Sequence, residues 1–139
     1  MPPAPLSDTL AEAALLDCLT HFPQVQLRVT GACMEPRLPE GAIVRLEAAG
    51  RVPPRWGDVV LVRQAAGLRL HRLVWCPPLG AAWRTQADRS PTCDPRLDHT
   101  EVLAVATAGA EAASLRSRTA AARGLGRALL TRLRAFLPR

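Results

Sequence analysis

The stretch Gly31-Ala32-Cys33-Met34-Glu35-Pro36 decides the predicted fold. Residues 25–29 before it alternate apolar and polar side chains, which is typical of a half-buried strand. Gly31 permits a turn that a β-carbon would resist, and Pro36 ends the extended segment. The sequence therefore predicts a thiol, Cys33, on a short stiff turn at the end of a strand. That position suits a nucleophile, although the hexapeptide alone favours a buried and inert cysteine.

The composition limits the available chemistry. All 18 basic residues are arginine, so an amine general base is excluded, because arginine does not lose its proton in proteins. Seven arginines lie in residues 112–139, which contain no acid, whereas the other 111 residues hold 11 arginines and 12 acids, a net charge of −1. The basic charge therefore belongs to the C-terminal tail.

The four cysteines, at positions 18, 33, 76 and 93, form no CxxC pair. We therefore expect no zinc site, no disulfide framework and no cofactor. The N-terminus lacks a signal-peptide pattern, and no apolar run is long enough to cross a membrane. We expect a cytoplasmic protein, with an anionic membrane surface as a candidate partner for residues 112–139.

Six short strands are predicted, because apolar or alternating runs are separated by Gly and Pro turn signals. They are expected over residues 25–30, 42–47, 58–63, 68–75, 82–86 and 101–108. The predicted fold class is therefore mainly β, a coiled, partly open β-barrel-like core over residues 25–108. A lead and helix (residues 1–24) precede the core, and a basic amphipathic helical tail (residues 109–139) follows it.

Helical spacing predicts one helix on each side of this core. In residues 9–20, opened by the capping box Thr9-x-x-Glu12, the apolar residues Leu10, Ala13, Leu16 and Leu19 are expected to form one buried stripe. Residues 110–137 are expected to be helical, with interruptions at Gly124 and Gly126. One side of this helix would carry Leu125, Leu129, Leu133, Phe136 and Leu137.

Three histidines are candidates for acid–base chemistry. His21 lies at the end of the first predicted helix, where it would cap the helix carbonyls. His99 lies in a polar loop beside Asp98 and is expected to be solvated. His71 is different, because it lies inside the apolar strand over residues 68–75. It is therefore the candidate base for a thiol nucleophile, although a hydrogen-bonded histidine on the sheet surface fits the strand equally well.

At this point residues 29–107 resemble the catalytic core of the signal peptidase I and LexA-like peptidase superfamily. The hexapeptide is similar to the family's Gly-x-Ser-Met-x-Pro box, with Cys33 in the serine position. Residues 55–60 (Arg-Trp-Gly-Asp-Val-Val) resemble its Arg-x-Gly-Asp-Val-Val box. Residues 70–74 (Leu-His-Arg-Leu-Val) look like the His-Arg segment of the archaeal and endoplasmic-reticulum branch. Residues 40–44, 87–95 and 101–105 resemble its remaining boxes in the same order.

The resemblance implies a cysteine endopeptidase that cleaves a peptide or leader segment. Cys33 would be the nucleophile and its backbone N–H an oxyanion donor. His71 would be the general base in place of lysine, a matched change because a thiol is acidic enough to form an ion pair with histidine. Asp94 would accept a hydrogen bond from the second imidazole nitrogen, with Asp88 as the alternative.

The same resemblance implies how the substrate binds. The peptide would add as an extended strand beside the nucleophile, with Leu27, Val29 and Met34 near its side-chain pockets. Asp58 is predicted to stabilise the neighbouring loop and hairpin and to take no part in the chemistry.

Two other functions stay open at this point. One is a LexA-type module that cleaves itself or binds a partner in response to a signal. A nucleic-acid partner is not expected, because no helix-turn-helix precedes the core and the tail has one aromatic residue, Phe136. The other is a non-catalytic relative whose cleft only binds a peptide.

Overall fold

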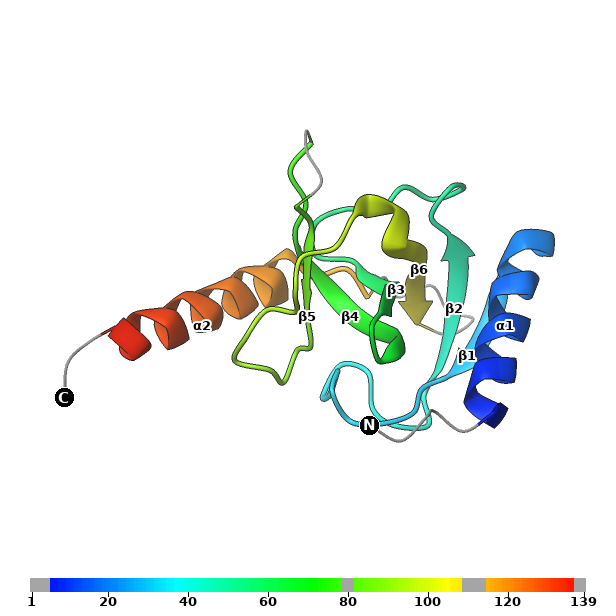
Figure 1. Ribbon diagram of the computed structural model, residues 1–139, viewed down its shortest axis with the longest axis horizontal. Helices are drawn as coiled ribbons and strands as arrows, with labels where there is room; N and C mark the ends of the chain where they lie inside the picture. Colours follow the sequence, from blue (N-terminus) through cyan, green and yellow to red (C-terminus); the bar gives the residue numbers. More distant parts are fainter. Residues whose placement is uncertain (1–5, 79–81, 109–114, 137–139) are drawn as a thin grey trace.

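The computed structural model describes residues 6–78, 82–108 and 115–136, which form an antiparallel sheet with a helix at each end (Figure 1). The helices are α1 (Leu6–His21) and α2 (Arg118–Phe136), and the short 3-10 helix η1 covers His99–Glu101. The strands are β1 (Val25–Arg28), β2 (Ile43–Ala48), β3 (Val59–Gln64), β4 (Gly67–Trp75), β5 (Arg84–Gln86) and β6 (Val102–Ala108). All six predicted strands are confirmed, with small shifts at their ends, and so is the mainly β fold class.

The sheet is open and has the strand order β1-β2-β6-β3-β4-β5. Every neighbouring pair is antiparallel. The strands β1 and β5 are the two edges, so the sheet does not close into a barrel. The loops that follow these two edge strands are nevertheless in contact, because the Arg89 N–H donates to the carbonyl of Cys33 at 3.1 Å.

The core lies on both faces of the sheet, because successive strand residues point to opposite sides. One face packs around Val59, Leu61 and Ala104 and is covered by the buried Met34. The other face packs residues 60, 62, 73, 102 and 105 against Leu97 of the loop before β6. Strand β3 is therefore buried on both sides, which explains its unbroken apolar run over residues 59–62.

The N-terminal helix packs differently from the prediction. Leu19 is buried and Leu15 packs against the core, but Leu10 is 72% exposed and Ala13 is also exposed. The predicted stripe is therefore wrong in its first half. The reason is that the face of α1 turned to the sheet runs through Glu12, Leu15 and Leu19, since Glu12 accepts the Leu68 N–H of β4 and both leucines pack on the core, so Leu10 and Ala13 point away. The helix lies beside β1 and β2 (Figure 1).

The C-terminal helix is continuous through both glycines, which corrects the predicted interruption. A β-carbon on Gly124 would lie 3.1 Å from the Gln86 Oε1 atom, so the glycine permits close packing of α2 on the sheet. Ala121 and Ala128 are buried in the same contact. The helix begins at Arg118, and residues 109–114 and Leu137 of the predicted tail lie outside the described residues.

Candidate active site

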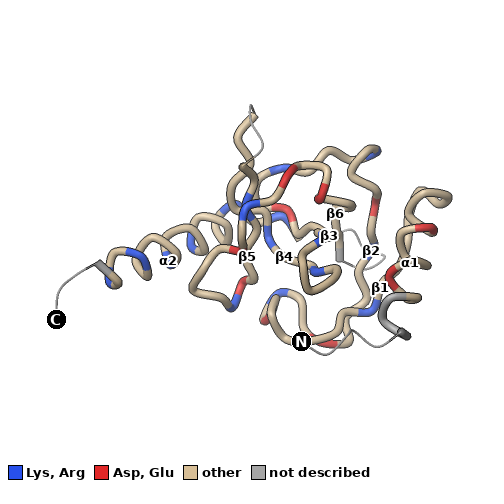
Figure 2. The backbone as a smooth tube through the Cα atoms, in the orientation of Figure 1, with Lys and Arg blue, Asp and Glu red and all other residues tan. Residues whose placement is uncertain are grey.

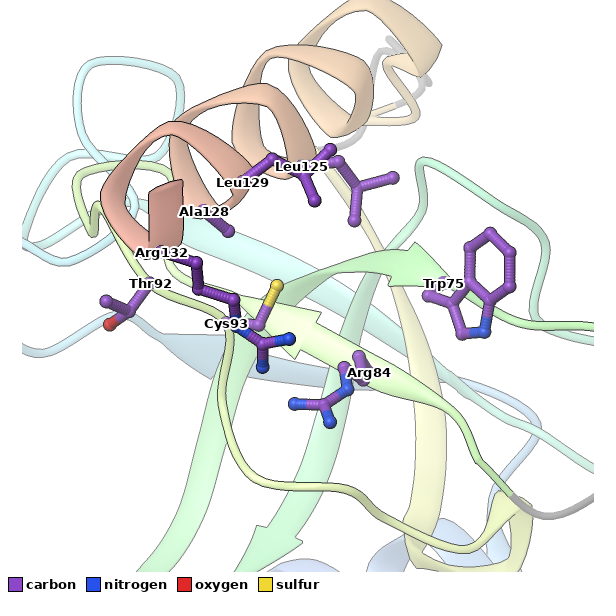
Figure 3. A pocket seen from close by; sticks show the side chains of 8 residues that line it. All are labelled: Trp75, Arg84, Thr92, Cys93, Leu125, Ala128, Leu129 and Arg132. Carbon is purple, nitrogen blue, oxygen red and sulfur yellow. The ribbon is translucent and has the colours of Figure 1, made fainter. Parts of the chain in front are cut away.

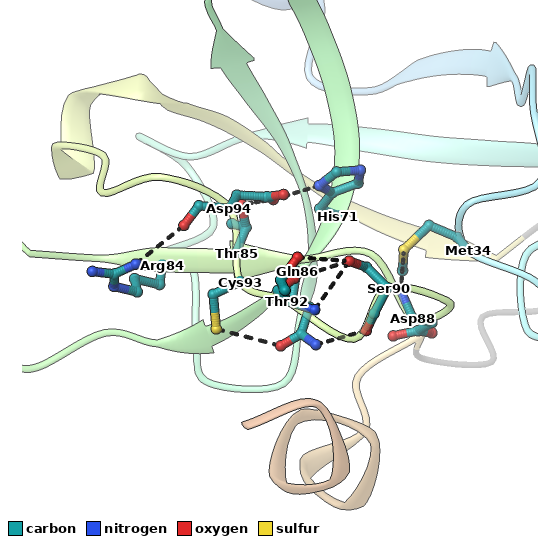
Figure 4. A network of polar contacts seen from close by, with 10 residues as sticks. All are labelled: Met34, His71, Arg84, Thr85, Gln86, Asp88, Ser90, Thr92, Cys93 and Asp94. Atoms are coloured by element: carbon teal, nitrogen blue, oxygen red, sulfur yellow. Dashed lines mark hydrogen bonds and ion pairs between the residues drawn. The ribbon is translucent and has the colours of Figure 1, made fainter. Parts of the chain in front are cut away.

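His71 and Asp94 form a close polar contact (Figure 4). His71 lies in β4, is 8% exposed, and its Nδ1 atom is 2.5 Å from Asp94 Oδ2. Asp94 follows β5 and is held there by Thr85, whose hydroxyl donates to Oδ2 at 2.6 Å and whose carbonyl accepts the Asp94 N–H at 2.8 Å. The carboxylate therefore fixes the imidazole ring. Among the described residues, no group hydrogen-bonds to the second ring nitrogen, Nε2.

The charge on Asp94 determines which tautomer His71 adopts. Burial by itself raises the pKa of the Asp94 carboxyl, but the hydrogen bonds from His71 and Thr85 more than offset it, so the pKa is lowered. The Gln64 amide lowers the pKa further, although its buried Nε2 has no hydrogen-bond partner among the described residues. An ionised carboxylate only accepts, so His71 carries its proton on Nδ1 and leaves Nε2 free to accept another.

Cys33 lies in the turn after β1, as predicted, and it is exposed. The turn is held by hydrogen bonds from the Glu35 N–H to Ala32 O at 3.2 Å and from the Leu38 N–H to Met34 O at 3.0 Å. Met34, which is 1% exposed, anchors the turn in the core. Cys33 therefore lies at the surface and not in the core.

The thiol and the imidazole are not hydrogen-bonded to each other, although Asp94 acts on both. Arg69 and Asp94 both act electrostatically on the Cys33 thiol. Arg69 is two residues from His71 on the same face of β4, and Asp94 binds the ring of His71. In the described part of the chain, no hydrogen bond joins Cys33 Sγ to His71. The predicted thiolate–imidazolium pair is thus absent from this state.

The pKa of the Cys33 thiol is correspondingly raised, mainly because the sulfur is partly buried. Its own backbone N–H and the Arg69 guanidinium lower the pKa, and the charges of Asp94 and Asp88 raise it. The thiol is therefore the dominant form at neutral pH in the absence of a closer contact with His71. The Cys33 N–H, the predicted oxyanion donor, makes no hydrogen bond to another described residue and interacts with its own sulfur.

Asp88, the alternative partner for His71, binds Arg72 instead. The guanidinium is fully buried and donates to both carboxylate oxygens of Asp88, each at 2.7 Å. The same guanidinium donates to the carbonyls of Gly57 at 2.8 Å and Leu115 at 2.9 Å. Arg72 therefore links β4 to the segments that contain Gly57, Asp88 and Leu115. No local sequence pattern predicted this role.

Two of the three predicted pocket residues are part of the core. Val29 is 6% exposed, and its backbone continues the pairing of β1 with the segment before β2, through Gly41 and Ala42. Met34 is 1% exposed, and its sulfur accepts the Asp88 N–H at 3.4 Å. Leu27 is partly buried and packs against the same core. The strand alternation and the turn direct the side chains of Val29 and Met34 into the core. That they lie near the substrate pockets stays a prediction.

A free backbone edge lies next to His71. Strand β5 pairs with β4 only from Arg72 onward, so the first half of β4 has no neighbouring strand on that side in the described residues. The Leu68 N–H points to this side and donates to Glu12 Oε1 of α1 at 3.1 Å. The backbone N–H and C=O groups of successive strand residues point to opposite sides of the strand, so those of Leu70, two residues on, point to the same side as those of Leu68. Leu70 therefore offers a donor and an acceptor to an added strand.

The other residues singled out from the sequence have structural roles. His21 Nδ1 lies 2.9 Å from the Asp17 carbonyl near the end of α1, which confirms the predicted cap. His99 is exposed and lies 3.2 Å from Asp98 Oδ1. Asp58 accepts from the Arg55 N–H at 2.7 Å and from Arg116 Nε at 2.6 Å, so it stabilises the loop as predicted.

Comparison of the chain with models of protein families, with curated proteins and with solved structures gave no match. Neither α1 nor α2, over the residues described, combines the length and apolar character that crossing a bilayer requires. The described residues also contain no group of three or more potential metal ligands.

Proposed function

We propose that this protein is a cysteine endopeptidase that cleaves an extended peptide or leader segment. In this proposal Cys33 is the nucleophile, His71 is the general base and Asp94 orients His71. The observation that carries it is the buried His71–Asp94 hydrogen bond, which leaves Nε2 without a partner among the described residues, while the charge of the same Asp94 acts on the exposed Cys33 thiol. That arrangement of nucleophile, base and orienting group is the one that activates a thiol.

The free edge of β4 supports an extended substrate. A peptide strand pairing with Leu70 would run beside His71 and meet the turn that carries Cys33. Such recognition uses backbone hydrogen bonds, so it depends more on the extended conformation of the peptide than on its side chains. The substrate class that fits is an unfolded segment, such as a leader or a linker, and not a folded surface.

The chemical step uses groups of this chain only. His71 Nε2 accepts the thiol proton, and the sulfur attacks the scissile carbonyl carbon, whose oxygen becomes an anion bound by the Cys33 N–H. The C–N bond then breaks as His71 returns the proton to the leaving amine. Water, deprotonated by His71, hydrolyses the resulting thioester and regenerates the thiol.

The thiol and Nε2 must approach hydrogen-bonding distance for this step, because they are not bonded in the free state. Catalytic hydrogen bonds are often long in free enzymes and tighten when substrate binds. Here the bound strand would fill the space beside His71 and exclude water from the thiol. We therefore expect activation of Cys33 to depend on the substrate.

The test is digestion of a mixed peptide library by the purified protein, read by mass spectrometry. Wild type should cut, whereas Cys33→Ala and His71→Ala should each abolish cutting. Cys76→Ala and His99→Ala are the matched controls and should cut like wild type. Cleavage that survives in Cys33→Ala would overturn the proposal.

Two observations favour a second candidate, a peptide-binding module without hydrolysis. No hydrogen bond joins Cys33 and His71 among the described residues, and the pKa of the Cys33 thiol is raised. In that case library peptides would be retained by the wild-type protein and recovered intact. Binding would then survive in Cys33→Ala.

A further inference from the structure

The C-terminal helix exposes a leucine strip, which we define as Leu125, Leu129, Leu130 and Leu133. Leu129 and Leu133 are each 61% exposed and Leu130 is 54% exposed, while Leu125 is partly buried. Residues four apart lie on one face of a helix, so residues 125, 129 and 133 form a continuous row. The buried face of α2, at Ala121, Gly124 and Ala128, is a different one.

Arginines border this strip on both sides. Arg132 is one turn from Leu129 and Arg134 is one turn from Leu130. The helix contains five arginines and no acid (Figure 2). In the described part of the chain, none of these five forms an ion pair with a carboxylate. The helix therefore presents exposed apolar surface and unneutralised positive charge together.

A groove continues the same surface onto the sheet (Figure 3). It has a volume of about 530 Å³ and lies between α2 and the outer strands, with Leu125 and Leu129 on one wall and Trp75 on the other. Trp75 is 52% exposed. Arg84 and Arg132 both act electrostatically on Cys93 in this groove, so both guanidinium groups face it.

We propose that α2 and the rim of this groove bind the surface of an anionic lipid bilayer. The leucine strip and Trp75 would enter the boundary between head groups and acyl chains, and the arginines would contact lipid phosphates. A helix with an apolar face, a strongly basic polar face and no acid is suited to lying in that interface. The inference does not rest on the proposed peptidase activity.

The distribution of charge favours a bilayer over a folded partner. The 111 residues before the tail carry a net charge of −1, so attraction to an anionic surface is concentrated on residues 112–139. The last turns of α2 project away from the sheet (Figure 1), so a flat surface meets them without obstruction. An anionic bilayer offers hydrocarbon that would bury the leucine strip and phosphates that would pair with the arginines.

The test is co-sedimentation of the full chain with vesicles of phosphatidylcholine, with and without about an equal part of phosphatidylglycerol. Wild type should bind only the vesicles that contain phosphatidylglycerol, and Trp emission should shift to shorter wavelength. Binding should be lost at about 1 M salt, where the screening length falls to about 3 Å. Failure to bind these vesicles at low salt, or equal binding to both compositions, would overturn the proposal.

Matched variants separate the apolar and the charged contributions. Leu129→Ser/Leu133→Ser should weaken binding at least about tenfold, because each leucine loses its burial in the interface. Leu10→Ser changes a leucine of α1 that is even more exposed and should have no effect. Arg132→Gln/Arg134→Gln should weaken binding by about fivefold per arginine, whereas Arg51→Gln, in an exposed loop, should not.

The double leucine variant also identifies the main alternative, a peptide-binding role for the strip. If wild type and Leu129→Ser/Leu133→Ser bind vesicles equally, the bilayer proposal is wrong. If that variant also slows peptide cleavage in the absence of vesicles, the strip belongs to a peptide site. Thermal unfolding should be nearly unchanged, because both leucines are exposed.

Discussion

The backbone N–H of Arg89 donates to the carbonyl oxygen of Cys33 and so joins the loops that follow the two opposite edge strands, β5 and β1. The contact of the Asp88 N–H with Met34 Sδ is a second link between these loops. The sheet must therefore curl far enough for its ends to meet. As a result, the turn that carries the thiol rests on the loop that supplies Asp94.

Substitution of Asp94 should mainly lower the cleavage rate, whereas substitution of Asp88 should mainly lower the stability of the fold. Asp94→Asn is expected to lower the cleavage rate by about 10²-fold or more while the fold is kept, because the imidazole loses its anionic orienting group. Asp88→Asn is expected to reduce the free energy of unfolding by about 3–5 kcal/mol, because Arg72 is left as a buried unpaired charge. Cleavage assays and urea unfolding measure the two effects, and a reversed pattern would contradict the assignment of partners.

The free energy of unfolding should depend on pH through the carboxyl group of Asp94. Its pKa is lowered in the folded protein, so its ionisation adds stability at any pH above the unfolded value of about 3.9. That contribution is lost as the pH falls through the lower, folded-state pKa. The difference in unfolding free energy between wild type and Asp94→Asn should therefore be largest near neutral pH and shrink below about pH 4. A difference that stays constant down to strong acid would show that the carboxylate is not held by His71 and Thr85.

The reactivity of the Cys33 thiol should change when Arg69 is removed. The guanidinium lowers the pKa of this thiol, so Arg69→Gln should raise it further and slow alkylation by iodoacetamide at neutral pH. Arg63→Gln, on the neighbouring strand and exposed, is the matched control. The measurement is the pH dependence of Cys33 alkylation by mass spectrometry. In the free protein the apparent pKa should lie above the ordinary value of about 8.5, and equal rates in all three proteins would contradict the placement of Arg69.

The two glycines of α2 should respond oppositely to alanine. A β-carbon on Gly126 meets nothing within 4 Å, so Gly126→Ala should stabilise the protein by about 0.5–1 kcal/mol through helix propensity. A β-carbon on Gly124 would crowd Gln86, which is 1% exposed and held by a hydrogen bond from its Nε2 to Ser90 O. Gly124→Ala should therefore destabilise the protein. Thermal or urea unfolding of the two variants measures these changes in stability. Equal stabilisation by both substitutions would show that α2 does not pack this closely on Gln86.

The strands could be predicted because local rules determine them. Period-two alternation, the apolar run at 59–62 and the turn residues between segments all act over a few residues. The hydrogen bond between His71 and Asp94 was expected only through the family resemblance, since 23 positions separate the two residues. Asp88 remained the alternative partner, ranked behind Asp94.

Other features depend on packing between distant segments, which local patterns do not encode. The alternation predicts which side of a strand Val29 faces, but not that this side is core. The four acceptor atoms that surround Arg72 come from three separate segments of the chain. The helical spacing of Leu10 and Ala13 is real, but the helix turns the side with Glu12, Leu15 and Leu19 toward the sheet, so both residues are exposed.

The contact between Glu12 and Leu68 predicts that α1 competes with the substrate for the free edge of β4. Glu12 Oε1 accepts the Leu68 N–H, one of the backbone groups that an added strand would use. Glu12→Ala should therefore lower the KM of an extended peptide several-fold and leave kcat nearly unchanged, because Glu12 has no part in the proposed chemical step.

The same change removes one hydrogen bond between α1 and the sheet, so the free energy of unfolding should fall by about 1 kcal/mol. Glu40→Ala, an exposed acid in the turn before β2, is the control for the loss of one negative charge. A KM that rises in Glu12→Ala, or falls equally in Glu40→Ala, would show that the peptide does not bind along this edge. The strand-addition model would then be wrong even if Cys33 and His71 were both required for cleavage.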